Sequence, residues 1–288
     1  MSFPPSPLWK PACPFATTAD QRATERAAVR DYLQQTTELQ LSYGPRVAGS
    51  NSSGYRAVHD MITTMAACPG YWAIETDDFD DVVEKTGEMK HFSHIIATFE
   101  KGNSSNGHLV LAAHFDSKWF PDGSRFVGAC DSAVPVVMLF ELMKRLSTVA
   151  ASRNSTTASA DSNTANDEEG NNHIDVEHNS LPLVTVMFFD GEEAFYRWEG
   201  TDNTYGSRHL AAKWASEEGR IDSIGLFVLL DLIGPSGPTF HNYFPESTGS
   251  SYLKLHRIEA QRRVEGKLLS AQPGSSAEKK KKKGEPNS

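Results

Sequence analysis

Two hydrophobic patterns alternate along the chain: short continuous apolar runs, and longer stretches in which apolar residues recur every three or four positions. The short runs at 93–99, 108–114, 184–189 and 225–231 are rich in β-branched or aromatic residues and have the length of strands. Helical spacing is found at 20–39, after Ser52 or Ser53, at 131–146, from about Ser207, and at 251–268. Strands that alternate with helices indicate a mainly parallel sheet with helices on both faces.

The predicted fold is therefore α/β: a single domain in which a central, mostly parallel mixed sheet is flanked by helices. The inner strands are expected to include residues 109–113, 184–189 and 226–230. Residues 93–99 and 108–114 are expected to pair through a polar turn at 102–107. The acidic run at 75–84 is expected to be an edge strand.

Polar segments divide the chain of 288 residues. Residues 1–18 are rich in proline and predict an extended arm, and residues 19–268 are long and apolar enough to form the domain. Residues 151–180 are rich in Ser, Thr, Asn, Asp and Glu, so we expect a disordered surface insertion within that domain. Residues 269–288 predict a disordered lysine-rich tail.

Charge and cysteine content narrow the class of protein. The net charge of −9 argues against nucleic acid as the main partner. Three cysteines give no disulfide framework, and no apolar run reaches the ~18 residues of a membrane span. The first residues lack the apolar core of a signal peptide, which leaves the localisation unassigned.

An acidic turn follows the apolar run at 184–189. Asp190 and Gly191 end the run, and Glu192 and Glu193 follow directly. Two adjacent carboxylates at the C-terminal end of a strand repel each other unless a cation or a proton intervenes. One interpretation is a metal ligand beside a general base, and the other is an exposed acidic turn. This segment alone leaves both interpretations open.

Further polar groups stand at the ends of two other predicted strands and at a helix start. His114 ends one strand, Asp231 ends another, and Asp131 begins the helix at 131–146. His114 alone could be a structural hydrogen-bonding residue, and Asp131 alone could be an N-cap. Taken together, acidic and imidazole groups at several strand ends of an α/β sheet indicate a metal centre. This donor set suits zinc, with one position open for water or a substrate oxygen.

Five motifs extend this interpretation: AHFDSK, FVGACDSAVP, FFDGEEAF with a tryptophan three residues later, TYGSRHLA and LLDLIGPSGPTF. In this order, over about residues 22–258 without the polar insertion, the sequence resembles the animal-type glutaminyl-peptide cyclotransferases, or glutaminyl cyclases. These enzymes belong structurally with the zinc aminopeptidases, so the resemblance implies a zinc-exopeptidase-like fold. It also implies an acyltransferase that converts the N-terminal glutamine of peptides to pyroglutamate with release of ammonia.

The resemblance assigns roles to individual positions. Asp131 and Glu193 match the zinc-binding carboxylates of the family, which implies one zinc ion as the cofactor. Glu192 matches the general acid/base, and Asp231 matches a second catalytic carboxylate near the substrate amine. Trp198 matches an aromatic residue that lines the substrate pocket.

His114 and Asp116 lie in the family's AHxDS motif. A histidine at that place binds metal in the related two-metal aminopeptidases but not in the cyclases, so His114 is expected to be part of the site architecture. The expected partners are peptide or protein substrates with N-terminal Gln, with no nucleic acid and no transmembrane segment, and the protein is expected to be a monomer. The family is often secretory, whereas no signal peptide is visible here.

The sequence departs from the family at two places. The family's third zinc ligand is a histidine in a Trp-His pair near the C-terminus, whereas this chain ends in KKKKKGEPNS. The fold is therefore expected to be C-terminally incomplete and zinc binding to be weak. A cysteine pair of many relatives is replaced by Ala113 and Val136. Two alternatives stay open: a zinc aminopeptidase of the same fold, and an inactive truncated remnant that acts as a binding module.

Overall fold

The computed structural model describes residues 22–50, 52–67, 71–160, 181–235 and 240–265. The chain separates into two compact units, Met1–Gly234 and Pro235–Ser288. The first unit holds the sheet and every residue that the sequence assigns to the site. The expected extended arm at 1–18 and the expected tail at 269–288 lie outside the described residues.

The first unit is built on a five-stranded mixed sheet with the strand order β1-β2-β4-β3-β5. The strands are β1 (Trp72–Val83), β2 (Glu88–Phe99), β3 (Gly102–His114), β4 (Leu181–Phe189) and β5 (Leu226–Leu229). β3 pairs in parallel with β4 and with β5, whereas β2 pairs antiparallel with β1 and with β4. The predicted α/β class and mixed sheet are confirmed, and the parallel strands are those whose ends carry the acidic residues.

The order of the strands corrects one expectation. β2 and β3 are consecutive in the chain but do not pair, because β4 lies between them. The last six residues of β4 are all buried, and a strand that is apolar on both faces belongs at the centre of a sheet. The predicted turn at 102–107 is part of β3 itself, with a register irregularity between Asn103 and His108.

The two edges of the sheet differ in how well they match the sequence prediction. β1 is an edge strand, as expected for residues 75–84. β5 is the other edge strand within the described residues, so the expectation that 226–230 form an inner strand is wrong. Phe227 and Leu229 are exposed and alternate with partly buried residues, a period of two that is typical of a half-covered strand.

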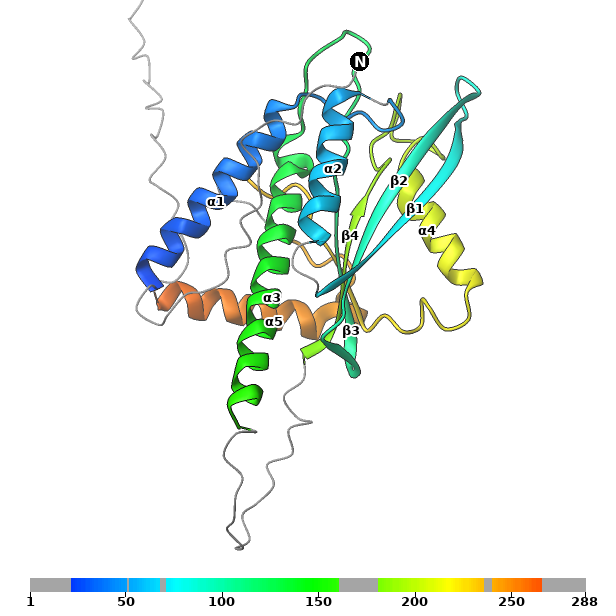
Figure 1. Cartoon of the computed structure of the whole chain (residues 1–288). Helices are drawn as coiled ribbons and strands as arrows, with labels where there is room; N and C mark the ends of the chain where they lie inside the picture. Colours follow the sequence, from blue (N-terminus) through cyan, green and yellow to red (C-terminus); the bar gives the residue numbers. More distant parts are fainter. Residues whose placement is uncertain (1–21, 51, 68–70, 161–180, 236–239, 266–288) are drawn as a thin grey trace, which may run out of the picture. The chain divides into compact units, whose positions relative to one another are not determined.

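Helices cover both faces of the sheet (Figure 1). α1 (Arg22–Ser42), α2 (Ser53–Ala67) and α3 (Val134–Ala160) lie on one side, and α4 (Tyr205–Ser216) lies on the other. Alternate residues of β2 separate into two cores, because Ile95 packs in the cluster that contains α2 and α3, and Ile96 packs in the cluster that contains α4. Ser52 caps α2 as predicted, since its Oγ atom accepts a hydrogen bond from the N–H of Tyr55 at 3.2 Å.

α3 is longer than the sequence predicts. It continues to Ala160, ten residues into the polar segment 151–180 that the composition predicts to be disordered. Residues 151–160 are therefore helical, which corrects this part of the prediction, and residues 161–180 lie outside the described residues. A helix whose first turns are packed on a sheet can extend into polar residues, because each further residue adds a hydrogen bond without a new nucleation cost. Within the described residues, no helix has the length and apolarity that crossing a membrane requires.

The second unit contains α5 (Pro245–Val264). This helix begins at Pro245, earlier than the expected start at 251, because proline is favourable at the first helical position. None of the described residues of α5 is buried, so the amphipathic pattern predicted for 251–268 has no buried face in this unit.

Candidate functional site

The candidate site lies where the three parallel strands end. His114 is the last residue of β3, the turn with Glu192 and Glu193 follows β4, and Asp231 follows β5. Because parallel strands end at the same edge of a sheet, these three segments converge there. The short turn η1 (Ala129–Ala133), which directly precedes α3, brings Asp131 to the same edge.

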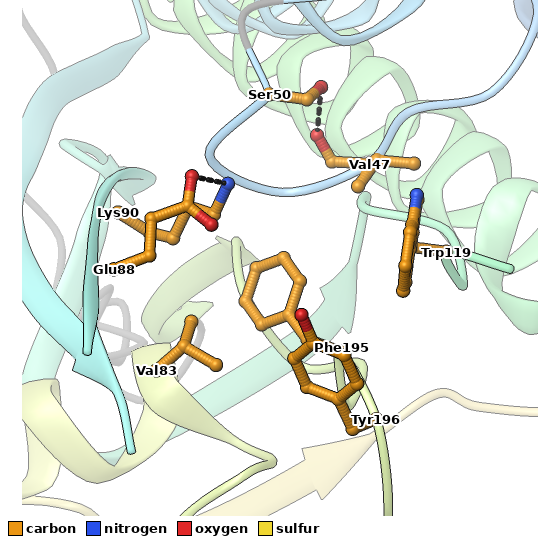
Figure 2. A pocket seen from close by; sticks show the side chains of 8 residues that line it. All are labelled: Val47, Ser50, Val83, Glu88, Lys90, Trp119, Phe195 and Tyr196. Carbon is orange, nitrogen blue, oxygen red and sulfur yellow. Dashed lines mark hydrogen bonds and ion pairs between the residues drawn. The ribbon is translucent and has the colours of Figure 1, made fainter. Parts of the chain in front are cut away.

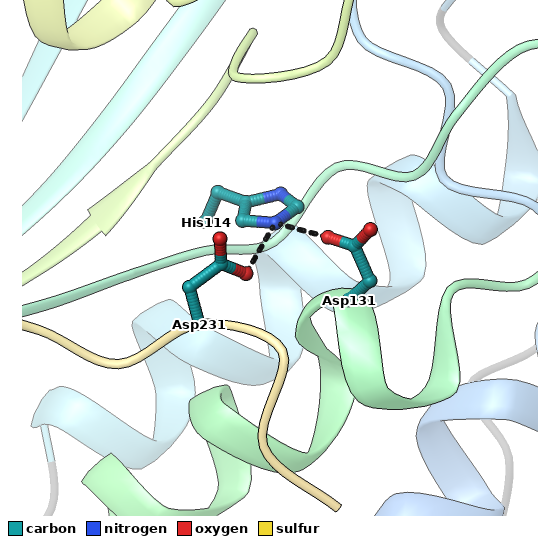
Figure 3. A group of neighbouring side chains, drawn as sticks. All are labelled: His114, Asp131 and Asp231. Atoms are coloured by element: carbon teal, nitrogen blue, oxygen red, sulfur yellow. Dashed lines mark hydrogen bonds and ion pairs between the residues drawn. The ribbon is translucent and has the colours of Figure 1, made fainter. Parts of the chain in front are cut away.

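His114 is the centre of a cluster of charged side chains (Figure 3). Its Nε2 atom lies 2.9 Å from Oδ1 of Asp131 and 3.5 Å from Oδ1 of Asp231. Its Nδ1 atom lies 3.3 Å from Oδ1 of Asp116. Burial alone lowers the pKa of His114, but the hydrogen bonds with the three aspartates outweigh burial and hold this pKa well above its usual value. The imidazole is therefore a cation shared among three carboxylates.

Asp131 is held by an irregular turn rather than by a regular helix start. η1 is a π-helical turn in which Asp131 has φ −127° and ψ 76°, and Ser132 has φ −131° and ψ 44°; the peptide bond between them is cis. Single π-type turns recur at functional sites. The carboxylate of Asp131 bonds to His114, so the interpretation of Asp131 as a simple N-cap is wrong.

Asp231 is fixed from two directions. Its Oδ1 atom accepts a hydrogen bond from Oγ of Ser132 at 2.7 Å and another from the N–H of Leu232 at 2.8 Å. Burial alone raises the pKa of Asp231, but the hydrogen bonds with His114 and Ser132 and the charge of His114 bring it below its usual value. This carboxylate is therefore ionised in the neutral range and keeps one orientation.

The buried carboxylate of Asp116 holds the acidic turn after β4. It accepts hydrogen bonds from the backbone N–H groups of Glu192 at 3.2 Å and Glu193 at 3.1 Å. The pKa of Glu192 is raised to about 8, chiefly by burial and further by the nearby carboxylates, against the opposing charge of His114. The pKa of Glu193 is raised to about 7 by burial and by the charges of Asp116 and Asp131. Both pKa shifts are in the direction that burial and repulsion between neighbouring carboxylates cause.

Three of these side chains could hold a cation together. A nitrogen of His114 and oxygen atoms of Asp131 and Asp231 all lie within 4.8 Å of one another. One imidazole nitrogen and two carboxylate oxygens are donors of the kind that zinc takes in proteins. The residues present therefore fit a zinc ion, although this set differs from the expected pair of Asp131 and Glu193. Glu192 lies beside the cluster, with its Oε2 atom 3.9 Å from Nε2 of His114.

Besides Glu192, two further expected site residues, Glu193 and Trp198, lie outside this three-donor cluster. Oε2 of Glu193 is 3.8 Å from Nζ of Lys118, although the charge of Asp131 is close enough to raise the pKa of Glu193. Trp198 lies in the loop after the acidic turn, with 55% of its surface exposed. The roles assigned to these two residues, like those assigned to Asp131, Glu192 and Asp231, stay predictions.

Arg46, which the sequence analysis did not single out, ties segments of the site together. Its guanidinium is fully buried and donates hydrogen bonds to the carbonyl oxygens of Phe115 at 2.6 Å, Val127 at 2.7 Å and Gly128 at 3.2 Å. Burial lowers its pKa to about 10, which still leaves it charged at neutral pH. A charged residue inside the otherwise apolar segment 45–48 was the one sequence signal that could have indicated this role.

Asp202, also missed in the sequence, organises the loop that follows the acidic pair. Its carboxylate accepts hydrogen bonds from the backbone N–H groups of Phe195 at 3.0 Å, Tyr196 at 2.8 Å and Arg197 at 2.8 Å. The hydroxyl of Tyr205 donates a fourth at 2.8 Å. Burial raises the pKa of Asp202, but these four hydrogen bonds outweigh burial and lower it. An aspartate in a polar loop carries no sequence signal of such a role.

Curated proteins similar to this chain are glutaminyl-peptide cyclotransferases. That of Drosophila melanogaster is 32% identical over 259 residues, which cover 90% of this chain and 61% of that protein. That of Bos taurus is 39% identical over 198 residues, which cover 65% of this chain and 48% of that protein. The chain therefore spans about half the length of the curated relatives that it matches.

Solved structures give the same picture of the fold. The glutaminyl cyclase of Macrostomum lignano superposes with a TM-score of 0.64 at 27% identity and covers 93% of this chain and 77% of its own. A Zn-dependent exopeptidase of Parabacteroides distasonis has a TM-score of 0.56 at 18% identity, over 82% of this chain and 72% of its own, which is a likeness of fold alone. The expected zinc-exopeptidase-like fold is therefore confirmed. The sequence profile of peptidase family M28 matches residues 94–276, more than half of the chain, and the chain therefore belongs to peptidase family M28.

Proposed function

We propose that this chain carries the catalytic centre of a zinc-dependent glutaminyl-peptide cyclotransferase, an acyltransferase that converts the N-terminal glutamine of peptides to pyroglutamate and releases ammonia. The observation that supports this most is the Glu192 carboxylate, which lies beside the charged cluster at the strand ends and has a pKa of about 8. A general acid/base that works near neutral pH needs such a pKa. The likeness to glutaminyl cyclases in sequence and in fold supports the same reaction.

The proposed cofactor is one zinc ion, held by Asp131 and Glu193. These two carboxylates belong to the crowded acidic group, and the raised pKa of Glu193 reflects negative charge that a cation would offset. When bound, zinc supplies a Lewis acid for the γ-carbonyl oxygen of the glutamine.

Glu192 is the proposed proton carrier. Its ionised carboxylate accepts a proton from the α-amine of the glutamine as the amine nitrogen bonds to the γ-carbonyl carbon. Its protonated form returns that proton to the side-chain amide nitrogen as the bond from carbon to that nitrogen breaks and ammonia leaves. A pKa of about 8 keeps both forms of Glu192 accessible near neutral pH.

Asp231 and Trp198 are the proposed substrate-positioning residues. The ionised carboxylate of Asp231, fixed by Ser132 and Leu232, offers a negative charge for the substrate amine. The exposed ring of Trp198 is free to cover a bound glutamine side chain. Holding the amine and the γ-carbonyl in attack geometry removes an entropic part of the barrier. The proposed substrates are peptides with N-terminal Gln, and the chain is proposed to act as a monomer.

The cluster of His114, Asp131 and Asp231 favours a second candidate function, that of a zinc aminopeptidase. In this case these three residues would hold the metal, and the reaction would release the first residue of a peptide rather than ammonia. The likeness to glutaminyl cyclases in sequence and in fold favours the cyclotransferase over this alternative. The cyclotransferase is therefore the better-supported function.

A single-turnover assay tests the proposal. Excess protein with zinc is mixed with Gln-Ala-Ala-amide, and both ammonia and the pyroglutamyl peptide are measured. Glu192→Gln is expected to lower the rate about 10²–10⁴-fold, because glutamine keeps the size of the side chain but cannot carry a proton. Glu199→Gln, exposed in the same loop, is the matched control and should keep the wild-type rate.

Two outcomes would count against this assignment. Release of free glutamine in place of ammonia would favour the aminopeptidase. An equal rate in the wild type and in Glu192→Gln would remove Glu192 from the mechanism.

A further inference from the structure

A cavity of about 190 Å³ lies beside the acidic site and has no role in the proposed reaction. Its walls are formed chiefly by Val47, Val83, Lys90, Trp119, Phe195 and Tyr196. Figure 2 shows Trp119 on one side of the cavity, Lys90 on the opposite side, and the rings of Phe195 and Tyr196 between them. Aromatic rings thus form much of the surface that an occupant would contact.

The aromatic walls of the cavity are held in place by contacts of their own. The backbone N–H groups of Phe195 and Tyr196 are bonded to the carboxylate of Asp202. The ring of Trp119 meets that of Tyr196 edge-on, with centroids 5.8 Å apart, and Phe195 is buried in a core cluster with Val83. A cavity whose walls are ordered before binding loses little conformational freedom when an occupant enters.

A narrow crevice links the lining of the cavity to the acidic site. It shares Val47, Trp119 and Phe195 with the cavity and is also lined by Asp116 and Glu193. Glu193 and Phe195 belong to the same short loop. The cavity therefore borders the loop that carries Glu193.

The size and chemistry of the cavity favour one aromatic side chain as its occupant. Small-molecule sites measure roughly 300–1,000 Å³, so a volume of about 190 Å³ suits a single side chain better than a whole ligand. Aromatic rings pack well edge-on or offset against walls such as Trp119, Phe195 and Tyr196. Nζ of Lys85 lies 4.3 Å from the ring centroid of Tyr196. Nζ of Lys90 lies 5.6 Å from that of Phe195 and 2.6 Å from Oε1 of Glu88, which also lines the cavity, so the charge of Lys90 is already paired and a neutral occupant fits best.

We propose that this cavity is a specificity subsite that receives an aromatic side chain, phenylalanine or tyrosine, from a position downstream of the N-terminal residue of a peptide substrate. This inference rests on the proposed function only for the identity of the first residue, glutamine. The subsite acts on peptide binding and not on the chemical step, so affinity is its direct readout.

Isothermal titration of the full 288-residue chain carrying Glu192→Gln, with zinc present, measures binding while cyclisation is slow. The probes are Gln-Ala-Ala-Ala-amide and the three peptides in which phenylalanine replaces one of the alanines. One phenylalanine peptide is expected to bind at least about tenfold more tightly than the alanine peptide, because burial of a phenylalanine side chain contributes that much or more. The other two phenylalanine peptides should gain less affinity, since only one of the three positions reaches the cavity.

Variants of the cavity walls identify where the phenylalanine binds. Tyr196→Ala and Trp119→Ala each remove a wall, and each is expected to reduce the phenylalanine advantage to less than about threefold while the affinity for the alanine peptide stays unchanged. Phe120→Ala is the matched control. Phe120 follows Trp119 in the chain, but its ring packs against Phe126 and is 38% exposed, so this variant should keep the full advantage.

The outcomes separate the subsite from the proposed function. Equal affinity for all four peptides, including no measurable binding, overturns the subsite, and so does an advantage that survives in both wall variants. Cyclisation of the same peptides by the wild-type chain is measured separately. If none is cyclised but the phenylalanine advantage is present, the proposed function fails and the subsite stands. If the alanine peptide is cyclised and phenylalanine brings no advantage, the subsite fails and the function stands.

Discussion

The two halves of the site lie at one edge of the sheet but are in opposite electrostatic states. Around the imidazole of His114 one cation offsets part of the charge of three aspartates: the pKa of His114 is held well above its usual value, and that of Asp231 is lowered. In the turn after β4 the carboxylates crowd one another, and burial together with neighbouring charge raises the pKa of Glu192 to about 8 and that of Glu193 to about 7. In the His114 half the internal cation prevails over burial, whereas in the acidic turn burial and like charge prevail over Lys118, whose Nζ atom lies 3.8 Å from Oε2 of Glu193.

An added cation would compete with a proton in either half. The pKa of His114 is held well above its usual value, and that of Glu193 is raised to about 7, so both groups carry protons at neutral pH. Asp131 belongs to both halves, because it lies 2.9 Å from Nε2 of His114 and its charge raises the pKa of Glu193. Asp131 is therefore a ligand in both candidate sets, and the proposed choice of Glu193 as its partner is tested by the zinc affinities of variants.

Removal of the internal cation should have the largest effect. His114→Ala leaves three aspartates without their shared partner, and breaking a buried ion pair in this way costs about 3–5 kcal/mol of unfolding free energy. Urea denaturation at neutral pH measures the loss. His91→Ala is the matched control, because its 2.9 Å contact with Asp80 lies at the surface and is worth at most about 1 kcal/mol. Similar losses in the two variants would contradict a charged cluster at His114.

The pH dependence of stability should separate the halves further. A carboxyl group with a raised folded pKa loses stabilisation as pH rises from the unfolded to the folded value, so Glu192 makes stability fall between pH 4.5 and about 8. The contribution of His114 is fully present below its unfolded pKa of 6.5 and is lost only as pH rises through the higher folded value. Of the two halves, therefore, only the acidic turn should make the stability fall as pH rises from about 5 to 6.5.

Glu192→Gln should reduce this fall by about 1–2 kcal/mol over that interval, since a shifted carboxyl group contributes up to about 1.4 kcal/mol per pH unit. Unfolding free energies from urea titrations at several pH values give the slope. Glu199→Gln, exposed in the same loop, should leave the slope as in the wild type. A slope that is the same in all three proteins would mean that Glu192 has an ordinary pKa.

Zinc affinity gives the smallest expected effect and the most direct comparison. Glu193→Gln removes a proposed ligand and should weaken zinc binding at least about tenfold, which equals about 1.4 kcal/mol. Asp231→Asn, in the His114 cluster, should change the Kd for zinc less than about threefold. Competition with a chromophoric chelator measures both values. If Asp231→Asn loses zinc and Glu193→Gln keeps it, the ligands are those of the His114 cluster, and the aminopeptidase becomes the favoured function.

The sequence predicts those parts of the fold that depend on local hydrophobic pattern. The run at 184–189 is apolar except for Thr185, and it forms most of the central strand β4. The order of the strands depends instead on which strand takes the most buried place, and no local pattern encodes that competition. The predicted pairing of 93–99 with 108–114 is therefore wrong, because β4 lies between these strands. Residues 151–160 are helical for a similar reason, since a packed helix extends into a segment whose composition predicts disorder.

The candidate site also has a part that the local sequence pattern predicts and a part that it does not. The apolar runs predict where the strands end, and with them the common edge that carries His114, Glu192 and Asp231. The partners of Arg46 could not be predicted, because they are backbone carbonyl oxygens 69 to 82 residues away in the chain, and every residue has such an oxygen. The cationic state of His114 depends on distances to three aspartates that only the folded chain sets.

The length of α3 separates Ala160 from the site. Asp131 lies just before this helix, whose 27 residues span about 40 Å. Ala160 therefore lies at the helix end that is remote from the acidic edge. In protein engineering, this makes the position after Ala160 an attachment point: an affinity tag, a fluorophore or a tether to a solid support placed there would leave the acidic edge open to peptides in solution.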